Sequence, residues 1–256
     1  MKKQTSLLAG AILMLAGMNA AHAEDTIRFA TEGAYPPFNE RAADGSLKGF
    51  EIDLGMALCE KIKRACEFQA QDWDGMIPGL LANKYDGIFA SMAITEERKK
   101  KIDFTNKYYQ TGGVFVARKG TQLDTADKAL GGKVIGTIPG VTQCYLEKAF
   151  PQATVRVYET ADSLYLDLES GRVDAILSDA IGVDFGLLKT ERGRDMEFVS
   201  EIYTDRECFG EGVGIGMRKE DTELRDQLNK AIAETRADGT YDKIMKKYFQ
   251  YDIYGK

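Results

Sequence analysis

Apolar and polar positions along the chain change period repeatedly, from the two-residue period of strands to the longer period of helices. Thr26–Ala30 and Cys66–Ala70 have the length and pattern of strands, and between them Phe50–Lys63 gathers its apolar residues roughly on one helical face. The pattern predicts further strands at Tyr85–Phe89, Val114–Ala117, Val134–Thr137, Thr154–Tyr158, Ala175–Leu177 and Gly212–Met217. It predicts further helices at Met76–Leu81, Glu96–Lys101, Thr142–Phe150, Ala161–Ser170, Asp179–Leu188, Thr222–Arg236 and Tyr241–Tyr248.

Strands that alternate with helices are typical of α/β folds, so we expect an α/β architecture built on mostly parallel sheets. A chain of 256 residues can form one large domain or two lobes of ordinary size. Gly112–Gly113 and Thr204–Arg206 are candidate crossings between two such lobes. In α/β folds ligands bind beyond the carboxyl ends of the strands, and candidate site residues are therefore sought there.

Residues 1–23 have the pattern of a secretory signal peptide. Lys2 and Lys3 precede an apolar stretch from about Leu7 to Met18, and Ala21–Ala23 is a cleavage site of the small-x-small kind. The apolar stretch is too short to cross a membrane. We therefore expect a soluble, exported mature chain.

Removal of this segment changes the charge and the available chemistry. The formal net charge is −6, and loss of the two lysines makes the mature chain more negative by two units. The one histidine of the chain, His22, is removed as well. This excludes Ser-His-Asp triads, Cys-His pairs and histidine-ligated zinc. An acidic exported chain is also poorly suited to bind nucleic acid.

Four cysteines remain, and an exported protein normally forms disulfides. Cys59 and Cys66 lie close together in sequence at the end of a predicted helix, and we expect them to be bonded. The sequence leaves open whether Cys144 pairs with Cys208. Since paired C-x-x-C spacing is absent, we expect no metal site, and no other cofactor is indicated.

Polar and aromatic residues follow five of the predicted strands. Together they form a set of acids, aromatic rings, hydroxyls and one arginine, which suits a zwitterion that carries an additional positive charge. The residues of this set, in chain order, are Glu32, Tyr35, Trp73, Ser91, Arg98, Thr142 and Asp179.

Four stretches carry a family resemblance: "GFEIDLGMALCEKI", "WDGMIPGL", "YDGIFASMAITEERKKKIDFT" and "DGTYDKIMKKYF". They resemble the polar amino-acid binding proteins of bacterial ABC importers, above all the lysine/arginine/ornithine- and histidine-binding group. "TEGAYPPFN" also resembles the octopine- and nopaline-binding members. The resemblance implies a two-lobed periplasmic binding protein, with residues 24–111 and 207–256 in one lobe and 112–206 in the other. Each lobe would be a mostly parallel sheet flanked by helices, with the ligand in the cleft.

The resemblance also implies roles for individual residues. Arg98 corresponds to the clamp for the ligand α-carboxylate, with Ser91 and Thr142 as hydroxyl donors to it, and Asp179 corresponds to the acceptor of the α-ammonium. A planar guanidinium can form two parallel bonds to a carboxylate, which supports the first role independently. Tyr35 and Trp73 correspond to rings that flank the ligand side chain. The further lining positions are Ala90, Ala93, Ile138 and Gln143.

Two departures from the family pattern bear on specificity. The basic-amino-acid binders carry Asp where this chain has Glu32, and Ser where it has Ala90 and Ala93. The two alanines can still line a site through backbone groups. Glu32 is longer than Asp by one methylene, and the opine-binding relatives also have Glu here. The sequence therefore does not determine how long the cationic side chain of the ligand is.

Each residue also has a simpler interpretation. Arg98 could be one more charge on a solvated helix, as we expect for Lys99–Lys101. Asp179 could be an ordinary helix N-cap. Glu32 could be a surface acid, and Tyr35 and Trp73 could be core rings. The convergence of these residues at matched strand ends favours the site.

The leading hypothesis is a periplasmic solute-binding protein that captures a basic amino acid for an ABC permease, with arginine favoured over lysine, ornithine and histidine. It would act as a monomer and not as an enzyme. One alternative is an opine-binding protein. A second is a cleft enzyme like the cyclohexadienyl dehydratases, in which Glu32 or Asp179 would be the acid or base.

Overall fold

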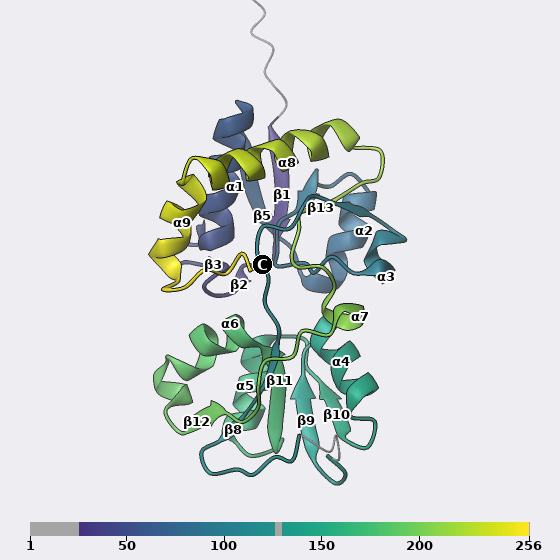
Figure 1. The fold of residues 1–256 in the computed structure, drawn as a ribbon, viewed down its shortest axis with the longest axis vertical. Helices are drawn as coiled ribbons and strands as arrows, with labels where there is room; N and C mark the ends of the chain where they lie inside the picture. Colours follow the sequence, from purple (N-terminus) through teal and green to yellow (C-terminus); the bar gives the residue numbers. More distant parts are fainter. Residues whose placement is uncertain (1–25, 126–129, 256) are drawn as a thin grey trace, which may run out of the picture.

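The computed structural model describes residues 26–125 and 130–255, so the expected signal peptide lies outside the described residues. The strands form two five-stranded sheets and one small three-stranded sheet. Figure 1 places the first sheet in the upper lobe and the second in the lower lobe, each flanked by helices. The expected α/β architecture is confirmed.

The first sheet has four strands in one direction and one against them. β1 pairs in parallel with β5 and β6, while β13 runs antiparallel to both β6 and β7. The strands of this sheet, in spatial order, are β5 (Cys66–Ala70), β1 (Ile27–Thr31), β6 (Gly87–Ile88), β13 (Gly216–Met217) and β7 (Asp103–Phe104).

The second sheet repeats this arrangement. β9 pairs in parallel with β10 and β11, and β8 runs antiparallel to β11 and β12. In each sheet the single reversed strand is the first that the chain forms after crossing from the other sheet. The strands of the second sheet are β10 (Thr154–Val157), β9 (Val134–Thr137), β11 (Ala175–Asp179), β8 (Gly113–Arg118) and β12 (Met196–Phe198).

Helices flank both sheets, and α1 buries an apolar face with Phe50, Leu54 and Leu58 in the core. Those of the upper lobe are α1 (Phe50–Ile62), η1 (Trp73–Gly75), α2 (Met76–Leu81), α3 (Glu96–Lys99), α8 (Thr222–Ala237) and α9 (Thr240–Tyr248). Those of the lower lobe are α4 (Val141–Ala149), α5 (Ala161–Glu169), α6 (Ala180–Val183), η2 (Asp184–Leu188), η3 (Glu191–Gly193) and α7 (Arg206–Phe209). The described residues include no helix long and apolar enough to cross a membrane.

Several predicted elements are shorter in the structure, as at Tyr85–Phe89, where only Gly87–Ile88 is a strand, and two elements differ more. The strand predicted at Gly212–Met217 is paired as a strand only at Gly216–Met217, and Val213 forms single bridges. Gly212 has a φ of 113°, which ordinary strand residues do not adopt. The helix predicted at Asp179–Leu188 is a short α-helix that continues as a wider π-turn.

A small antiparallel sheet follows β1 and was not predicted. Its strands have only two or three residues, too few for a periodic pattern to be visible. It turns the chain back after Glu32 and pairs Tyr35 with Asn39. Its strands are β2 (Ala34–Tyr35), β3 (Asn39–Arg41) and β4 (Leu47–Lys48).

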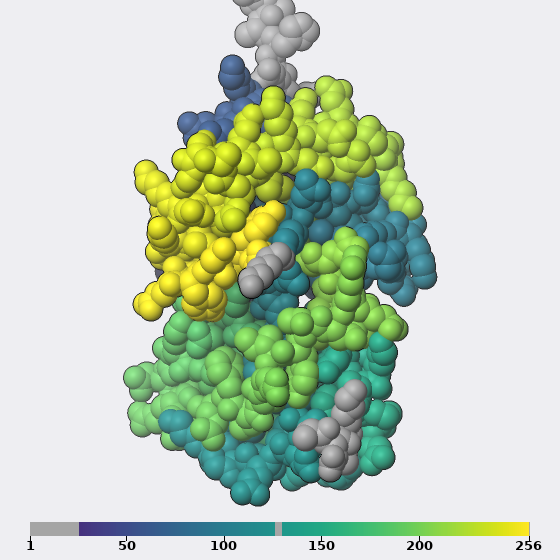
Figure 2. Space-filling view, viewed as in Figure 1, coloured from purple at the N-terminus to yellow at the C-terminus, as the bar shows by residue number. Residues whose placement is uncertain are grey.

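The chain passes between the two large sheets twice, and the two crossing segments pair with each other. Gly113 N donates to Tyr203 O at 2.9 Å, and Tyr203 N donates to Gly113 O at 2.7 Å. A Cβ atom at Gly112 would lie 2.3 Å from Tyr203 O, so only glycine permits this approach. Figure 2 shows the second crossing segment, with α7, on the surface at the waist between the lobes.

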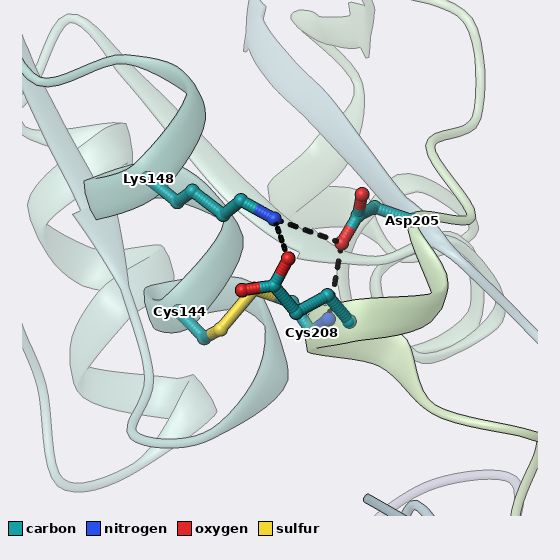
Figure 3. The surroundings of a disulfide bond; sticks show 5 residues. Cys144, Lys148, Asp205 and Cys208 are labelled. Carbon is teal, nitrogen blue, oxygen red and sulfur yellow. Dashed lines mark hydrogen bonds and ion pairs between the residues drawn. A yellow bond between two sulfur atoms is a disulfide. The ribbon is translucent and has the colours of Figure 1, made fainter.

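Two disulfides are present among the described residues. Cys59–Cys66 joins the end of α1 to β5, which confirms the sequence-based expectation. Cys144–Cys208 joins α4 to α7, with a Cα–Cα distance of 5.6 Å, and answers the question that the sequence left open. Lys148 lies beside it and pairs with Asp205 and Glu207 (Figure 3). The second crossing segment is thereby tied to the lower lobe.

Candidate functional site

A cavity lies between the two sheets, where their carboxyl ends face each other. Glu32 directly follows β1, Ile138 follows β9, and Asp179 ends β11. Parallel strands present the residues after their carboxyl ends at one edge, so the convergence follows from the topology. The predicted residues that line this cavity are Glu32, Tyr35, Trp73, Ala90, Ser91, Ala93, Arg98, Ile138, Thr142 and Asp179.

Gln143 was also predicted to line the site, and the structure does not place it on the cavity wall. Its Nε2 donates to Glu147 Oε1 at 2.8 Å, one turn later on α4. Neighbours in a helix point about 100° apart, and Val141 and Thr142 line the cavity while the side chain of Gln143 is turned toward Glu147. The prediction placed the start of α4 within one residue, at Thr142 instead of Val141, and did not anticipate the direction of the Gln143 side chain.

Arg98 is a cation without an acidic partner in residues 26–125 and 130–255. Its Nη1 donates to Ala93 O at 2.9 Å, and its guanidinium carbon lies 5.2 Å from the centroid of the Trp73 ring. Burial lowers the pKa of Arg98 to about 10, so the group remains charged at neutral pH. By contrast, Lys99 on the same helix pairs with Glu96 and Glu211. A desolvated guanidinium without a carboxylate favours binding of an anionic group.

The amino end of α4 faces this guanidinium. A Cβ atom at Gly140, the N-cap of α4, would lie 3.4 Å from Arg98 Nη2. No side chain caps this helix, and Val141 and Thr142 line the cavity. Free amide groups at a helix start favour an anion, so Arg98 and α4 together form a carboxylate-sized positive region.

Asp179 is both the N-cap of α6 and a cavity acid. It accepts from Gly182 N at 2.7 Å and from the hydroxyls of Thr111 and Tyr35. Burial raises the pKa of Asp179 to about 6, although these donors oppose the rise. The simpler interpretation of Asp179 as a cap is therefore correct, and it does not exclude a role in the cavity.

Glu32 is a half-buried acid with no basic partner in the part of the chain that the structure describes. Burial raises the pKa of Glu32 to about 7, and the negative charges of Glu51 and Asp72 add to the rise. The half-buried ring of Trp73 and the Tyr35 ring line the same cavity. A cation beside Glu32 would remove the cost of its charge.

Tyr35 belongs to both the cavity and the core. Its ring stacks on Phe38 with centroids 5.8 Å apart. Its hydroxyl reaches the lower lobe, where a Cβ atom at Gly182 would lie 2.5 Å away. Phe185 and Phe249 also meet across the lobes, with ring centroids 5.7 Å apart. The lobes are therefore in contact beside the cavity, through α6 and η2.

Several cavity residues were missed from the sequence. Tyr109 and Thr111 precede β8, so they lie on a crossing segment rather than after a strand. Phe209 belongs to α7, which has four residues and no visible period. The polar stretch around Thr204–Arg206 and the glycines at Gly112–Gly113 mark these segments, and this was the available signal. Glu159 also lines the cavity.

The chain was compared with known proteins. Residues 27–251 match the family of bacterial extracellular solute-binding proteins, family 3. The L-arginine-binding protein of Pseudomonas aeruginosa is 41% identical over 99% of both chains. The lysine/arginine/ornithine-binding periplasmic protein of Escherichia coli is 39% identical over 98% of this chain and 96% of its own.

Among solved structures, an ancestral arginine-binding protein bound to arginine is similar, with a TM-score of 0.81. It is 35% identical and is covered over 100% of its length by 89% of this chain. Such structures are two-lobed amino-acid-binding proteins, as expected for the fold. The names of these proteins give no support to the opine-binding and dehydratase alternatives.

Proposed function

Because the chain belongs to family 3 of the bacterial extracellular solute-binding proteins, we propose that it captures a basic amino acid and delivers it to an ABC permease. Arginine is the favoured ligand, ahead of lysine, ornithine and histidine. The protein acts in the periplasm after cleavage of residues 1–23, as a monomer, and as a carrier rather than an enzyme.

One observation carries this proposal: a desolvated Arg98 without a carboxylate partner among the described residues faces the uncapped start of α4. This pair receives the ligand α-carboxylate, through a bidentate contact with Arg98 and amide groups of α4. Ser91 from the upper lobe and Thr142 from the lower lobe also line the cavity and complete its shell. Asp179 receives the α-ammonium.

The remaining cavity residues contact the ligand side chain and determine which side chain is bound. A long cationic chain lies between the Tyr35 and Trp73 rings, where contact with a cation contributes roughly 0.5–2 kcal/mol. It ends at Glu32, whose charge it neutralises. Arginine fits best because its guanidinium stacks flat and pairs bidentately with a carboxylate. Ala90, Ala93 and Ile138 line the site through backbone and apolar contacts.

The two lobes move as units that close on the ligand. We assign residues 24–111 and 207–256 to one and residues 112–206 to the other, except that Cys144–Cys208 holds α7 at this boundary with the second lobe. Arg98 and Glu32 belong to the first, and Thr142 and Asp179 to the second. Only a closed cleft satisfies both ends of a zwitterion, and hinge closure around ligands is known for periplasmic binding proteins.

Native mass spectrometry of the exported protein tests the function. We expect a stoichiometric mass increase equal to one basic amino acid, which is recovered unchanged after denaturation. Incubation with arginine, followed by product analysis, should show no turnover. Turnover would refute the carrier role, and a copurified neutral or acidic ligand would refute the ligand class.

A further inference from the structure

Glu51 is a carboxylate in the first turn of α1 with no exposed surface. No salt bridge neutralises it within the described residues. Instead, four donors surround it: Asn39 Nδ2, Ser91 N, Ser91 Oγ and the Tyr108 hydroxyl. Asn39 Nδ2 and Ser91 N each require an acceptor, one on each oxygen, so these donors favour the ionised carboxylate, whereas burial raises the pKa of Glu51. Such a group is costly to bury, and its position calls for an explanation.

One oxygen of Glu51 holds the turn that carries Ser91. The amide of Ser91 donates to Glu51 Oε1 at 2.7 Å, and its hydroxyl donates to the same oxygen at 3.1 Å. Ser91 has a φ of 55°, in the left-handed region that residues other than glycine rarely adopt. These two bonds stabilise a backbone conformation that would otherwise be unfavourable. Ser91 lies on the cavity wall.

The other oxygen of Glu51 holds the turn that carries Glu32. Asn39 Nδ2 donates to Glu51 Oε2 at 2.6 Å, and Asn39 Oδ1 accepts from Gly33 N at 2.8 Å. Gly33 directly follows Glu32 and has a φ of 72°. Asn39 therefore transmits the position of Glu51 to the turn after β1.

We propose that Glu51 is a positioning residue that fixes the Glu32 turn and the Ser91 turn relative to each other. It thereby sets the spacing between two parts of the cavity. One part contacts the ligand side chain, and the other binds the ligand α-carboxylate and α-ammonium. This inference rests on the proposed function. It assigns to Glu51 no contact with the ligand, since Glu51 is not on the cavity wall.

Glu51→Gln tests the link with almost no change in size. The side-chain oxygen that remains can still accept from Ser91 and Tyr108, but the introduced amide nitrogen then faces Asn39 Nδ2, donor against donor. If Asn39 flips, it presents Nδ2 to Gly33 N instead. Either way one bond of the Asn39 connection is lost. We expect arginine affinity to fall roughly 10- to 100-fold by calorimetry, as for loss of a hydrogen bond to a charged group.

A second substitution should restore the connection. When Glu51→Gln is combined with Asn39→Asp, the new carboxylate at position 39 accepts both from the introduced amide at position 51 and from Gly33 N. The charge moves from one side chain to its neighbour, and every donor is paired again. We expect arginine affinity to return to within about threefold of wild type. Asn39→Asp alone should be worse than the double variant, because it sets two carboxylates against each other.

Two controls separate positioning from general stability. Tyr108→Phe removes a donor to Glu51 and leaves both turns attached, so arginine affinity should stay near that of wild type. Glu60→Gln removes a charge from the exposed side of α1 and should also be silent. If Glu51→Gln does not fold, Asn39→Ala cuts the same connection from the turn side.

Hydrogen exchange in ligand-free protein gives a readout that does not need a ligand. Glu51→Gln should raise exchange of the Gly33 amide, and the double variant should restore its protection. If wild type binds no arginine, the proposed function fails and exchange alone decides the role of Glu51. Unchanged exchange at Gly33 and Ser91, or arginine affinity within about threefold of wild type in Glu51→Gln, would overturn the inference.

Discussion

Arg98 and Gly140 meet across the two lobes, so closely that a Cβ atom at Gly140 would lie 3.4 Å from Arg98 Nη2. The contact brings the side chain of α3 in the upper lobe to the amino end of α4 in the lower lobe. Neither element alone would hold a carboxylate firmly. Under the proposed function, their approach couples ligand binding to lobe closure.

Arg98→Ala should nearly abolish arginine binding. Loss of one member of a buried, hydrogen-bonded charge pair costs about 2–5 kcal/mol. Arg98→Lys should also lose much of the affinity, because a point charge cannot replace the bidentate contact. Lys101→Ala on the exposed surface is the control. Calorimetry that gave Arg98→Ala an affinity within a few-fold of wild type would disprove the clamp.

Arginine affinity should depend on pH through Glu32. The pKa of Glu32 is about 7 in the free site, and a bound guanidinium favours the ionised form. Affinity should therefore fall as pH drops below about 7, and binding should release a proton in that range. Calorimetry in buffers of different ionisation enthalpy measures this release. The affinity for free glutamine, tested as a neutral ligand, should not change near pH 7. The Glu32→Gln variant should likewise lose the pH dependence of its arginine affinity in this range.

The same group has an opposite effect on the ligand-free fold. The folded-state pKa of Glu32 is raised from its ordinary 4.5 to about 7. The folded protein thus binds more protons than the unfolded chain in this range, and the contribution of Glu32 to stability declines as pH rises through it. Glu32→Gln should flatten that part of the stability profile in urea denaturation. An unchanged slope would show that burial does not perturb Glu32.

Gly182→Ala should hinder closure of the lobes. A Cβ atom there would lie 2.5 Å from the Tyr35 hydroxyl, on the opposite lobe. Such overpacking should destabilise the closed form by about 1–3 kcal/mol. Small-angle scattering at saturating arginine should then show a larger radius of gyration than wild type. Gly131→Ala, whose Cβ would meet only the Gln152 side chain at 3.3 Å, is the matched control.

The two disulfides should differ in their contribution to stability. Cys144–Cys208 spans 64 residues and Cys59–Cys66 spans 7. Loop-closure entropy then gives about 4 kcal/mol for the first and about 2 kcal/mol for the second. Urea denaturation of the paired Cys→Ser variants compares the two values. A larger loss from the short loop would show that local packing outweighs loop entropy.

Much of this structure could be predicted because its elements have a visible period. The strands at Cys66–Ala70 and Val134–Thr137 and the helix at Met76–Leu81 have the predicted bounds. β2 and α7, with two and four residues, have no visible period and could not be predicted. α7 is also held by Cys144–Cys208, which spans 64 residues of sequence. Most of the predicted cavity residues follow strand ends or open helices, where topology alone makes them converge.

Glu51 shows where sequence reasoning stops. An acid in the first turn of a helix is ordinary, because it complements the helix dipole. Its importance comes from Asn39, which lies 12 residues before it, and Ser91, which lies 40 residues further along the chain. No local pattern reveals such contacts. Gln143 illustrates the converse. The sequence predicted its helix but not the direction in which its side chain points.

A crystal structure of the protein grown with L-arginine is the most direct test of the site. We predict arginine in the cavity between the lobes, with its α-carboxylate on Arg98 and the start of α4 and its α-ammonium on Asp179. Its guanidinium should lie between Tyr35 and Trp73 and end at Glu32. Arginine bound elsewhere, or bound here with its guanidinium at Asp179 and its α-groups at Glu32, would contradict the proposed site.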